Sequence, residues 1–150
     1  MNAVRLLTDD HKRLKSLFRD YERLPDGAHA RRQKVVEQVF HELEVHTKLE
    51  EELFYPAVKA KADDEAEEMV NESCQEHHVV DVLMAEMKRL EPDNPEYAAK
   101  FTVLMENVEH HAEEEEEELF PKAKKLLGDD LTTIGQHMEQ RKDALMAAKR

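Results

Sequence analysis

The chain has 150 residues, 35 of them acidic and 22 basic, which gives a formal net charge of −13. This is the length of one ordinary domain, and a single cysteine, Cys74, excludes an intrachain disulfide. The negative charge disfavours contact with a phosphate backbone, so no nucleic-acid partner is expected. No apolar run approaches the roughly 20 residues that cross a bilayer, and the first residues lack the apolar core of a signal peptide. We therefore expect no membrane partner and a cytoplasmic location.

The first two predicted elements are amphipathic helices, because their apolar residues recur close to every 3.6 positions. The stripe of the first contains Val4, Leu7, His11, Leu14, Phe18 and Tyr21. After the turn at Pro25-Asp26-Gly27, the stripe of the second contains Val36, Val39, Leu43, His46, Glu50 and Leu53. Pro56 interrupts this helix because it lacks an N–H and clashes with the preceding turn. Residues 57–64 are then either a kinked continuation or a connector.

Three more helices follow. The stripe of the third contains Val70, Cys74, His77, Val80, Met84 and Met87, before the turn at Pro92-Asp93-Asn94-Pro95. The stripe of the fourth contains Phe101, Leu104, Val108, His111, Glu115 and Leu119, before Gly128. A fifth helix carries Leu131, Ile134, Met138 and Leu145 on one side. We predict an all-α fold in a single domain, 1–150: an antiparallel up-down four-helix bundle over about 3–127, with an additional C-terminal helix over about 130–148 packed on its outside.

The chain is an internal duplication. His11 and His77 are 66 residues apart, and 65 residues separate His46 from His111, Glu50 from Glu115, and Pro56 from Pro121. His46-x3-Glu50, followed by Leu53-Phe54-Tyr55-Pro56, repeats as His111-x3-Glu115, followed by Leu119-Phe120-Pro121. Two helix pairs of the same design should pack with approximate two-fold symmetry.

Each predicted bundle helix has a histidine where its stripe calls for an apolar residue, and two of them add a glutamate one turn later. One such histidine is usually a satisfied core residue. Four imidazoles and two carboxylates buried together would cost several kcal/mol per charged group without a cation. We predict a dinuclear site in which each ion takes two histidines and both ions share the two glutamates; this donor set suits iron or manganese. The predicted ligands are His11, His46, Glu50, His77, His111 and Glu115.

Two of the predicted ligands have a second histidine next to them, so the helical register decides which histidine of each pair faces inward. Counting ten residues back from Pro121 selects His111 rather than His110, as the same count from Pro56 selects His46. His77 lies on its stripe, whereas His78 is rotated about 100° away. The remaining histidines are expected to be bystanders: His29, His41, His78, His110 and His137. In the run 113–118, Glu115 and at most Glu118 should face inward. Tyr55 either donates a hydrogen bond near the site or packs in the core.

The set formed by His11, His46-x3-Glu50, His77 and His111-x3-Glu115, with Leu-Phe-(Tyr)-Pro after each His-x3-Glu, resembles the hemerythrin-like, or HHE cation-binding, family. The resemblance implies an antiparallel four-helix bundle around two non-haem iron ions, with manganese or zinc as alternative ions. The sequence departs from oxygen-carrying hemerythrins, which have a second histidine one turn after the third-helix ligand. Asp81 stands there and is either an additional ligand, an acceptor for a ligand's hydrogen bond or a residue on an access path.

Members of that family bind oxygen, nitric oxide or related species, or handle iron. The resemblance therefore implies a protein that binds or senses a small diatomic or peroxide ligand. Two alternatives remain open at this point. One is iron handling or donation for stress repair, and the other is an enzyme that consumes peroxide or nitric oxide at the same site. The sequence identifies no protein partner.

Overall fold

The structure is a computed structural model that describes residues 1–148, and no strand occurs within them. The helices are α1 (Ala3–Arg23), α2 (His29–Leu49), α3 (Tyr55–Ala60), α4 (Asp64–Met87), α5 (Pro95–Glu114), α6 (Phe120–Leu127) and α7 (Asp130–Ala148). Two π-helical turns, η1 (Glu50–Phe54) and η2 (Glu115–Leu119), join α2 to α3 and α5 to α6. The chain therefore forms four long helical rods and a fifth helix, which confirms the predicted all-α class.

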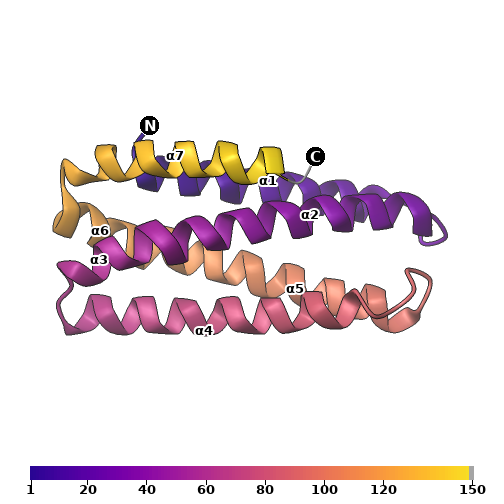
Figure 1. The fold of residues 1–150 in the computed structure, drawn as a ribbon. Helices are drawn as coiled ribbons and strands as arrows, with labels where there is room; N and C mark the ends of the chain where they lie inside the picture. The colour runs from indigo at the N-terminus through magenta and orange to yellow at the C-terminus, as the bar shows by residue number, and fades with distance from the viewer. Residues whose placement is uncertain (149–150) are drawn as a thin grey trace.

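The rods run up and down in turn (Figure 1). The connections from α1 to α2 and from α4 to α5 lie at one end, and those that follow α3 and α6 lie at the other. α1 packs on α2, α4 packs on α5, and α7 packs on both α1 and α2. The C-terminal helix thus covers the outside of the bundle, as the sequence predicted.

Helix boundaries coincide with capping residues. The side chains of Asn2, Asp63 and Asn94 each accept a hydrogen bond from a backbone N–H in the first turn of α1, α4 and α5. Such caps satisfy amide groups that have no partner inside the helix. At the other end of the chain, Gly128 has a φ of 51° where α6 ends, a conformation that glycine adopts without strain.

The two π-helical turns occupy equivalent places in the duplicated halves. Each begins at a predicted glutamate ligand, Glu50 or Glu115, and each is followed by a proline, Pro56 or Pro121, in the first turn of the next α-helix. In a regular α-helix, a proline ring clashes with the carbonyl of the residue four positions earlier. A π-helical turn holds one extra residue and so moves that carbonyl away from the ring. The alternatives left open for residues 57–64 are thereby resolved, since the helix continues to Ala60 and a short connector precedes Asp64.

The interior consists of two apolar clusters with a polar layer between them. The first contains side chains from the α3, α6 and α7 end, including Leu49, Phe54 and Met138. The second lies toward the α1–α2 and α4–α5 connections and includes Phe18 and Phe101. The buried polar residues among residues 1–148 are Asp10, His11, His46, Glu50, Ser73, His77, His111 and Glu115. The fold therefore concentrates its buried polar chemistry in one region with an apolar cluster on either side.

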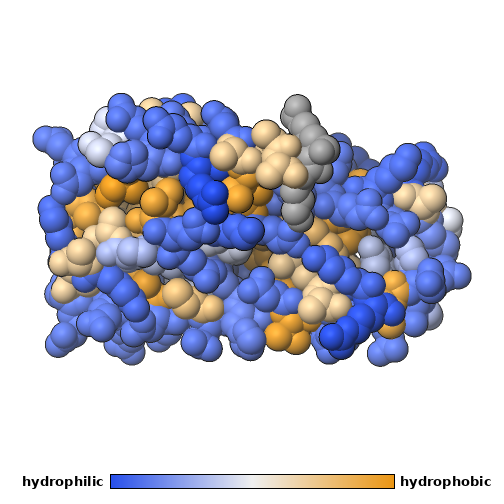
Figure 2. Space-filling view, viewed as in Figure 1, coloured by the Kyte–Doolittle hydropathy of each residue, from blue (hydrophilic) through white to orange (hydrophobic). Residues whose placement is uncertain are grey.

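The outer surface is largely hydrophilic on the face shown in Figure 2, in keeping with the net charge of −13. Among residues 1–148, no helix is both long and apolar enough to cross a membrane.

Candidate metal centre

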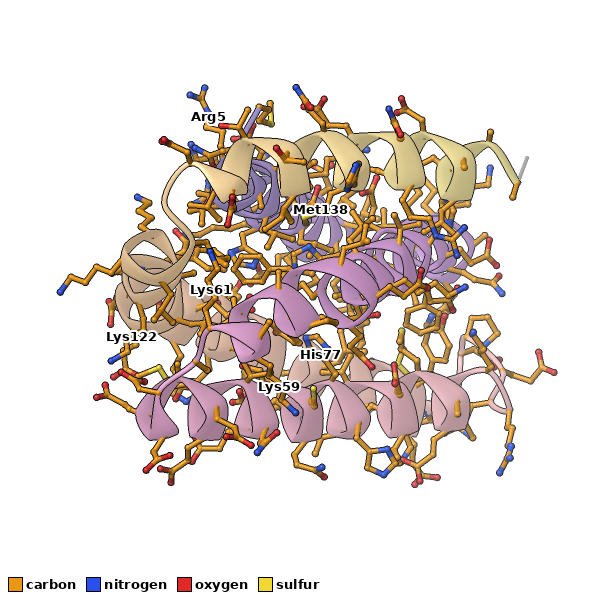
Figure 3. All side chains as sticks on the ribbon, turned by 60° about the vertical axis from the view of Figure 1, so that its left-hand side comes forward. Arg5, Lys59, Lys61, His77, Lys122 and Met138 are labelled. Atoms are coloured by element: carbon orange, nitrogen blue, oxygen red, sulfur yellow. The ribbon has the colours of Figure 1, made fainter. Side chains whose placement is uncertain are left out.

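All six predicted ligands are buried, and they meet in two groups. In each group, one potential ligand atom from every member lies within 4.8 Å of the others. One group is His11, His46 and Glu115, and the other is Glu50, His77 and His111. His77 projects from α4 toward the bundle interior (Figure 3). Their meeting agrees with the predicted site; their role as ligands stays a prediction.

Glu50 connects the two groups. Its Oε1 atom lies 3.2 Å from His46 Nε2 in one group and 3.0 Å from His77 Nε2 in the other. This is the arrangement expected of a carboxylate shared between two cations.

Glu115 makes the same connection from the other half of the duplication. Its Oε1 atom lies 3.1 Å from His11 Nε2 and 3.5 Å from His111 Nε2. The four Nε2 atoms thus surround two central carboxylates, and each carboxylate reaches one histidine of each group.

The opposite ring nitrogen, Nδ1, hydrogen-bonds to a carboxylate in every case. The distances are 2.9 Å for His11 with Glu116 and for His46 with Asp10, and 2.8 Å for His77 with Glu51 and for His111 with Glu76. Because Nδ1–H donates to a carboxylate, the Nε2 lone pair is directed at the centre, which is how metal-binding histidines are commonly held.

Sequence reasoning missed these four acceptors, although the duplication contains a signal for them. Asp10 and Glu76 directly precede the first histidine of each half, and Glu51 and Glu116 directly follow each central glutamate. The expectation that Glu118 could face inward was wrong, since that side chain is exposed. The π-helical turn shifts the register after Glu115, so the α-helical period no longer predicts which residue faces the site.

Tyr55 breaks the two-fold symmetry. Its hydroxyl donates a hydrogen bond to Glu115 Oε2 at 2.7 Å and lies 3.3 Å from His77 Nε2. The equivalent residue 65 positions later is Phe120, whose ring stacks on His11 with 5.8 Å between centroids. Both roles left open in the sequence are therefore observed: the ring packs in the first apolar cluster, and the hydroxyl lies on the side of His77 and His111.

The centre contains buried polar atoms without hydrogen-bond partners in the described part of the chain. They are both carboxylate oxygens of Glu50 and Nε2 of His46. Glu50 is completely buried, and its close contacts with imidazole lack hydrogen-bond alignment. Buried polar atoms without hydrogen-bond partners are costly, and a cation between these atoms would supply the missing partner. The residues present thus fit metal binding by imidazole and carboxylate.

The pKa values of the centre show how strongly its groups interact. Burial lowers the pKa of His46, but the charge of Glu50 and the hydrogen bond to Asp10 outweigh it and hold that pKa well above its usual value. Burial also lowers the pKa of His111, but Glu115 and Glu76 outweigh it and raise that pKa to about 9. Burial and the neighbouring charge of Glu50 raise the pKa of Glu115.

Asp81 and the five histidines expected to be bystanders lie outside the two groups of predicted ligands. Asp81 is exposed and belongs to neither, so the structure does not bring it to the site as an additional ligand. The bystander histidines His29, His78, His110 and His137 are exposed, and His41 is partly buried.

A small cavity lies against the centre on the side of the second apolar cluster. Its volume is about 20 Å³, and all four inward histidines line it together with apolar residues such as Leu14, Leu43, Val80 and Val108. A larger groove of about 260 Å³ lies between α1 and α5 and reaches His11 and Glu116 from outside.

The Hemerythrin HHE cation binding domain matches residues 2–123 of this chain. The chain belongs to this family. Among HHE-domain structures, the crystal structure of an HHE cation binding domain-containing protein from Mycobacterium kansasii has a TM-score of 0.84 at 24% identity, covering 99% of this chain and 89% of that one. This similarity confirms the helical-bundle fold.

Two further proteins are similar to this chain in sequence. An uncharacterized protein of Mycobacterium tuberculosis is 29% identical over 121 residues, which is 81% of this HHE-domain chain and 71% of the relative. A DNA nickase of Nostoc is 26% identical over 136 residues, covering 88% of this chain and 36% of the nickase. The nickase is therefore similar to this chain over about a third of its length.

Proposed function

We propose that this protein is a non-haem di-iron protein whose centre binds a small molecule such as oxygen, nitric oxide or peroxide. Family membership and the two His/Glu groups support a cation-binding role. The donor set supports two ions, because four imidazoles and two shared carboxylates exceed what one ion needs. Iron is proposed because mixed imidazole and carboxylate ligation suits it and the buried site holds no thiolate.

The observation that carries the choice of ligand is the size of the cavity beside the histidines. Its volume of about 20 Å³ exceeds the roughly 10–15 Å³ that one water molecule requires but leaves no room for an organic substrate. Apart from the imidazoles, Thr47 and Glu76, its walls are apolar, which favours an uncharged molecule over a hydrated ion. A diatomic gas or a peroxide matches both limits, with the larger groove beside His11 as its path from solvent.

The chain's own residues have separate tasks in this proposal. The inward histidines and the two shared glutamates would hold the ions, and ferrous ions would supply open coordination positions and electrons for a bound small molecule. The four outer carboxylates fix the tautomer of each imidazole. Tyr55 places a hydroxyl donor on the His77 and His111 side, and the apolar clusters on both sides exclude water from the layer.

The direct test is anaerobic loading with ferrous iron, followed by optical titration with oxygen, nitric oxide and peroxide in separate experiments. The proposal predicts a spectral change with at least one of them that saturates near one molecule per chain. The same titration of His111→Ala, which removes a predicted ligand, should give little change. A fully loaded protein that responds to none of the three would refute small-molecule binding.

The outcome also separates the alternatives. Consumption of many equivalents of peroxide or nitric oxide would identify an enzyme at the same centre. Rapid loss of iron to a chelator, without any small-molecule response, would favour iron handling.

A further inference from the structure

The four carboxylates that accept hydrogen bonds from the Nδ1 atoms differ in their access to water. The side chains of Glu51, Glu116 and Glu76 are 46%, 42% and 34% exposed, respectively. Asp10 is only 5% exposed. Water can solvate the free oxygens of the three glutamates, whereas a buried aspartate needs a partner from the protein.

That partner is Lys142 of α7. Its ammonium group lies 2.5 Å from Asp10 Oδ1, while Asp10 Oδ2 accepts the hydrogen bond from His46 Nδ1 at 2.9 Å. Both oxygens of Asp10 are therefore engaged. A continuous series of hydrogen bonds therefore runs from Lys142 on α7 through Asp10 on α1 to the predicted ligand His46 on α2.

The other half of the duplication has no such series of hydrogen bonds among residues 1–148. Glu76 is the counterpart of Asp10 and bonds to His111 in the same way, but its other close neighbours are His110 and Glu114. Within residues 1–148, Glu76 pairs with no lysine or arginine. α7 itself has no counterpart in the duplication and begins after residue 123, where the family match ends.

We propose that Lys142 is a positioning residue for the metal ion held by His11 and His46. Through Asp10, it keeps the proton of His46 on Nδ1 and the Nε2 lone pair directed at the centre. It thereby makes this ion position different from the one held by His77 and His111, although both have the same ligand types. This inference rests on the proposed metal centre and extends it to a helix beyond the residues that match the family.

The physical basis is charge compensation around a buried carboxylate. The ammonium group holds one carboxylate oxygen of Asp10 in place, so that the other oxygen faces His46 Nδ1. Without that group, the Asp10 side chain is free to turn toward water, and His46 loses a well-placed acceptor. Loss of an outer partner of a metal-binding histidine typically weakens metal affinity 10- to 100-fold.

The test is stepwise titration of the metal-free full chain with cobalt(II), followed by its visible absorption. Lys142→Met should weaken the binding of one cobalt ion about tenfold and leave the other unchanged. Lys142→Arg should restore most of the affinity, because it keeps the positive charge. Arg141→Gln is the matched control. Arg141 lies next to Lys142 on α7 but pairs with the exposed Glu52, so this variant should bind both ions as the wild type does.

A double-mutant cycle shows whether Lys142 acts through Asp10. Asp10→Asn should also weaken one ion, and Lys142→Met should then cause no further loss. Thermal melting of the metal-free variants checks that they fold, and Lys142→Gln replaces the methionine variant if that one does not.

Four results would overturn the proposal: unchanged affinity in Lys142→Met, equal weakening of both ions, an equal effect of Arg141→Gln, or additive losses in the cycle. Uptake of a single ion by the wild type would instead refute the dinuclear centre. The role of Lys142 would then be decided by whether that ion weakens in Lys142→Met and not in Arg141→Gln.

Discussion

Raising the pH from about 6 to about 9 should destabilise the metal-free protein, with His111 as one main cause. In the folded chain, Glu115 and Glu76 favour the protonated imidazole and raise its pKa from 6.5 to about 9. The folded state therefore binds this proton more tightly than the unfolded state does. The resulting stability is fully present below about pH 6.5 and is lost as the pH rises through about 9.

The size of the effect follows from the shift. Each pKa unit corresponds to about 1.36 kcal/mol, so His111 contributes at most about 3 kcal/mol to the free energy of unfolding at low pH. The pKa values of His46 and His77 are also raised, after burial is outweighed by Glu50 and the outer carboxylates, and they add to the loss. Bound metal should reverse the trend, because a metal ion must displace these protons and binds more tightly as the pH rises.

The assay is urea unfolding, followed by circular dichroism, in the presence of a chelator at several pH values. The quantity to compare is the change between pH 6 and pH 9, because His111→Ala also alters packing. That variant should lose up to about 3 kcal/mol less than the wild type. His110→Ala is the control, since this exposed side chain lies outside the layer, and it should keep the wild-type loss. Stability that is constant or increases with pH, or an unchanged loss in His111→Ala, would refute this account of the centre.

Three further outcomes are expected. His77→Ala should lose most bound metal and His78→Ala should not, as measured by metal analysis after desalting; equal losses would refute the assigned register. Glu50→Ala should weaken both ions together, because its carboxylate reaches one histidine of each group, and selective loss of one ion in a titration would contradict sharing. Gly135→Ala should destabilise the protein by about 1–3 kcal/mol, because a Cβ there would clash with the N-terminal backbone. At Gly27 a Cβ meets nothing within 4 Å, so Gly27→Ala should change stability by less than about 0.5 kcal/mol. Equal melting temperatures of the two variants would refute this expectation.

The helical elements and the inward-facing histidines and glutamates could be predicted because both depend on the local helical period. A helix places residues three and four apart on one face, so an imidazole on an apolar stripe could be assigned to the interior from the sequence. The choice of His111 over His110 needed only the stripe and the distance to Pro121. The structure agrees, with His111 at 8% exposure and the His110 side chain at 66%.

The outer contacts could not be predicted from that period. Glu116 follows the start of a π-helical turn, and the α-helical spacing used for the prediction ends there. Lys142 and Asp10 are 132 residues apart, and their contact depends on how α7 docks on α1. No local pattern contains that information, because an exposed lysine on a C-terminal helix looks the same in sequence whether or not it reaches a buried carboxylate.

The most direct measurement of the central claim is iron content together with magnetic coupling. The metal-free chain would be loaded anaerobically with ferrous iron, freed of excess iron and measured by iron analysis and Mössbauer spectroscopy before and after oxidation. The account predicts two irons per chain and, after oxidation, a single coupled pair bridged by Glu50 and Glu115. Saturation at one iron per chain, or two irons without magnetic coupling, would contradict it.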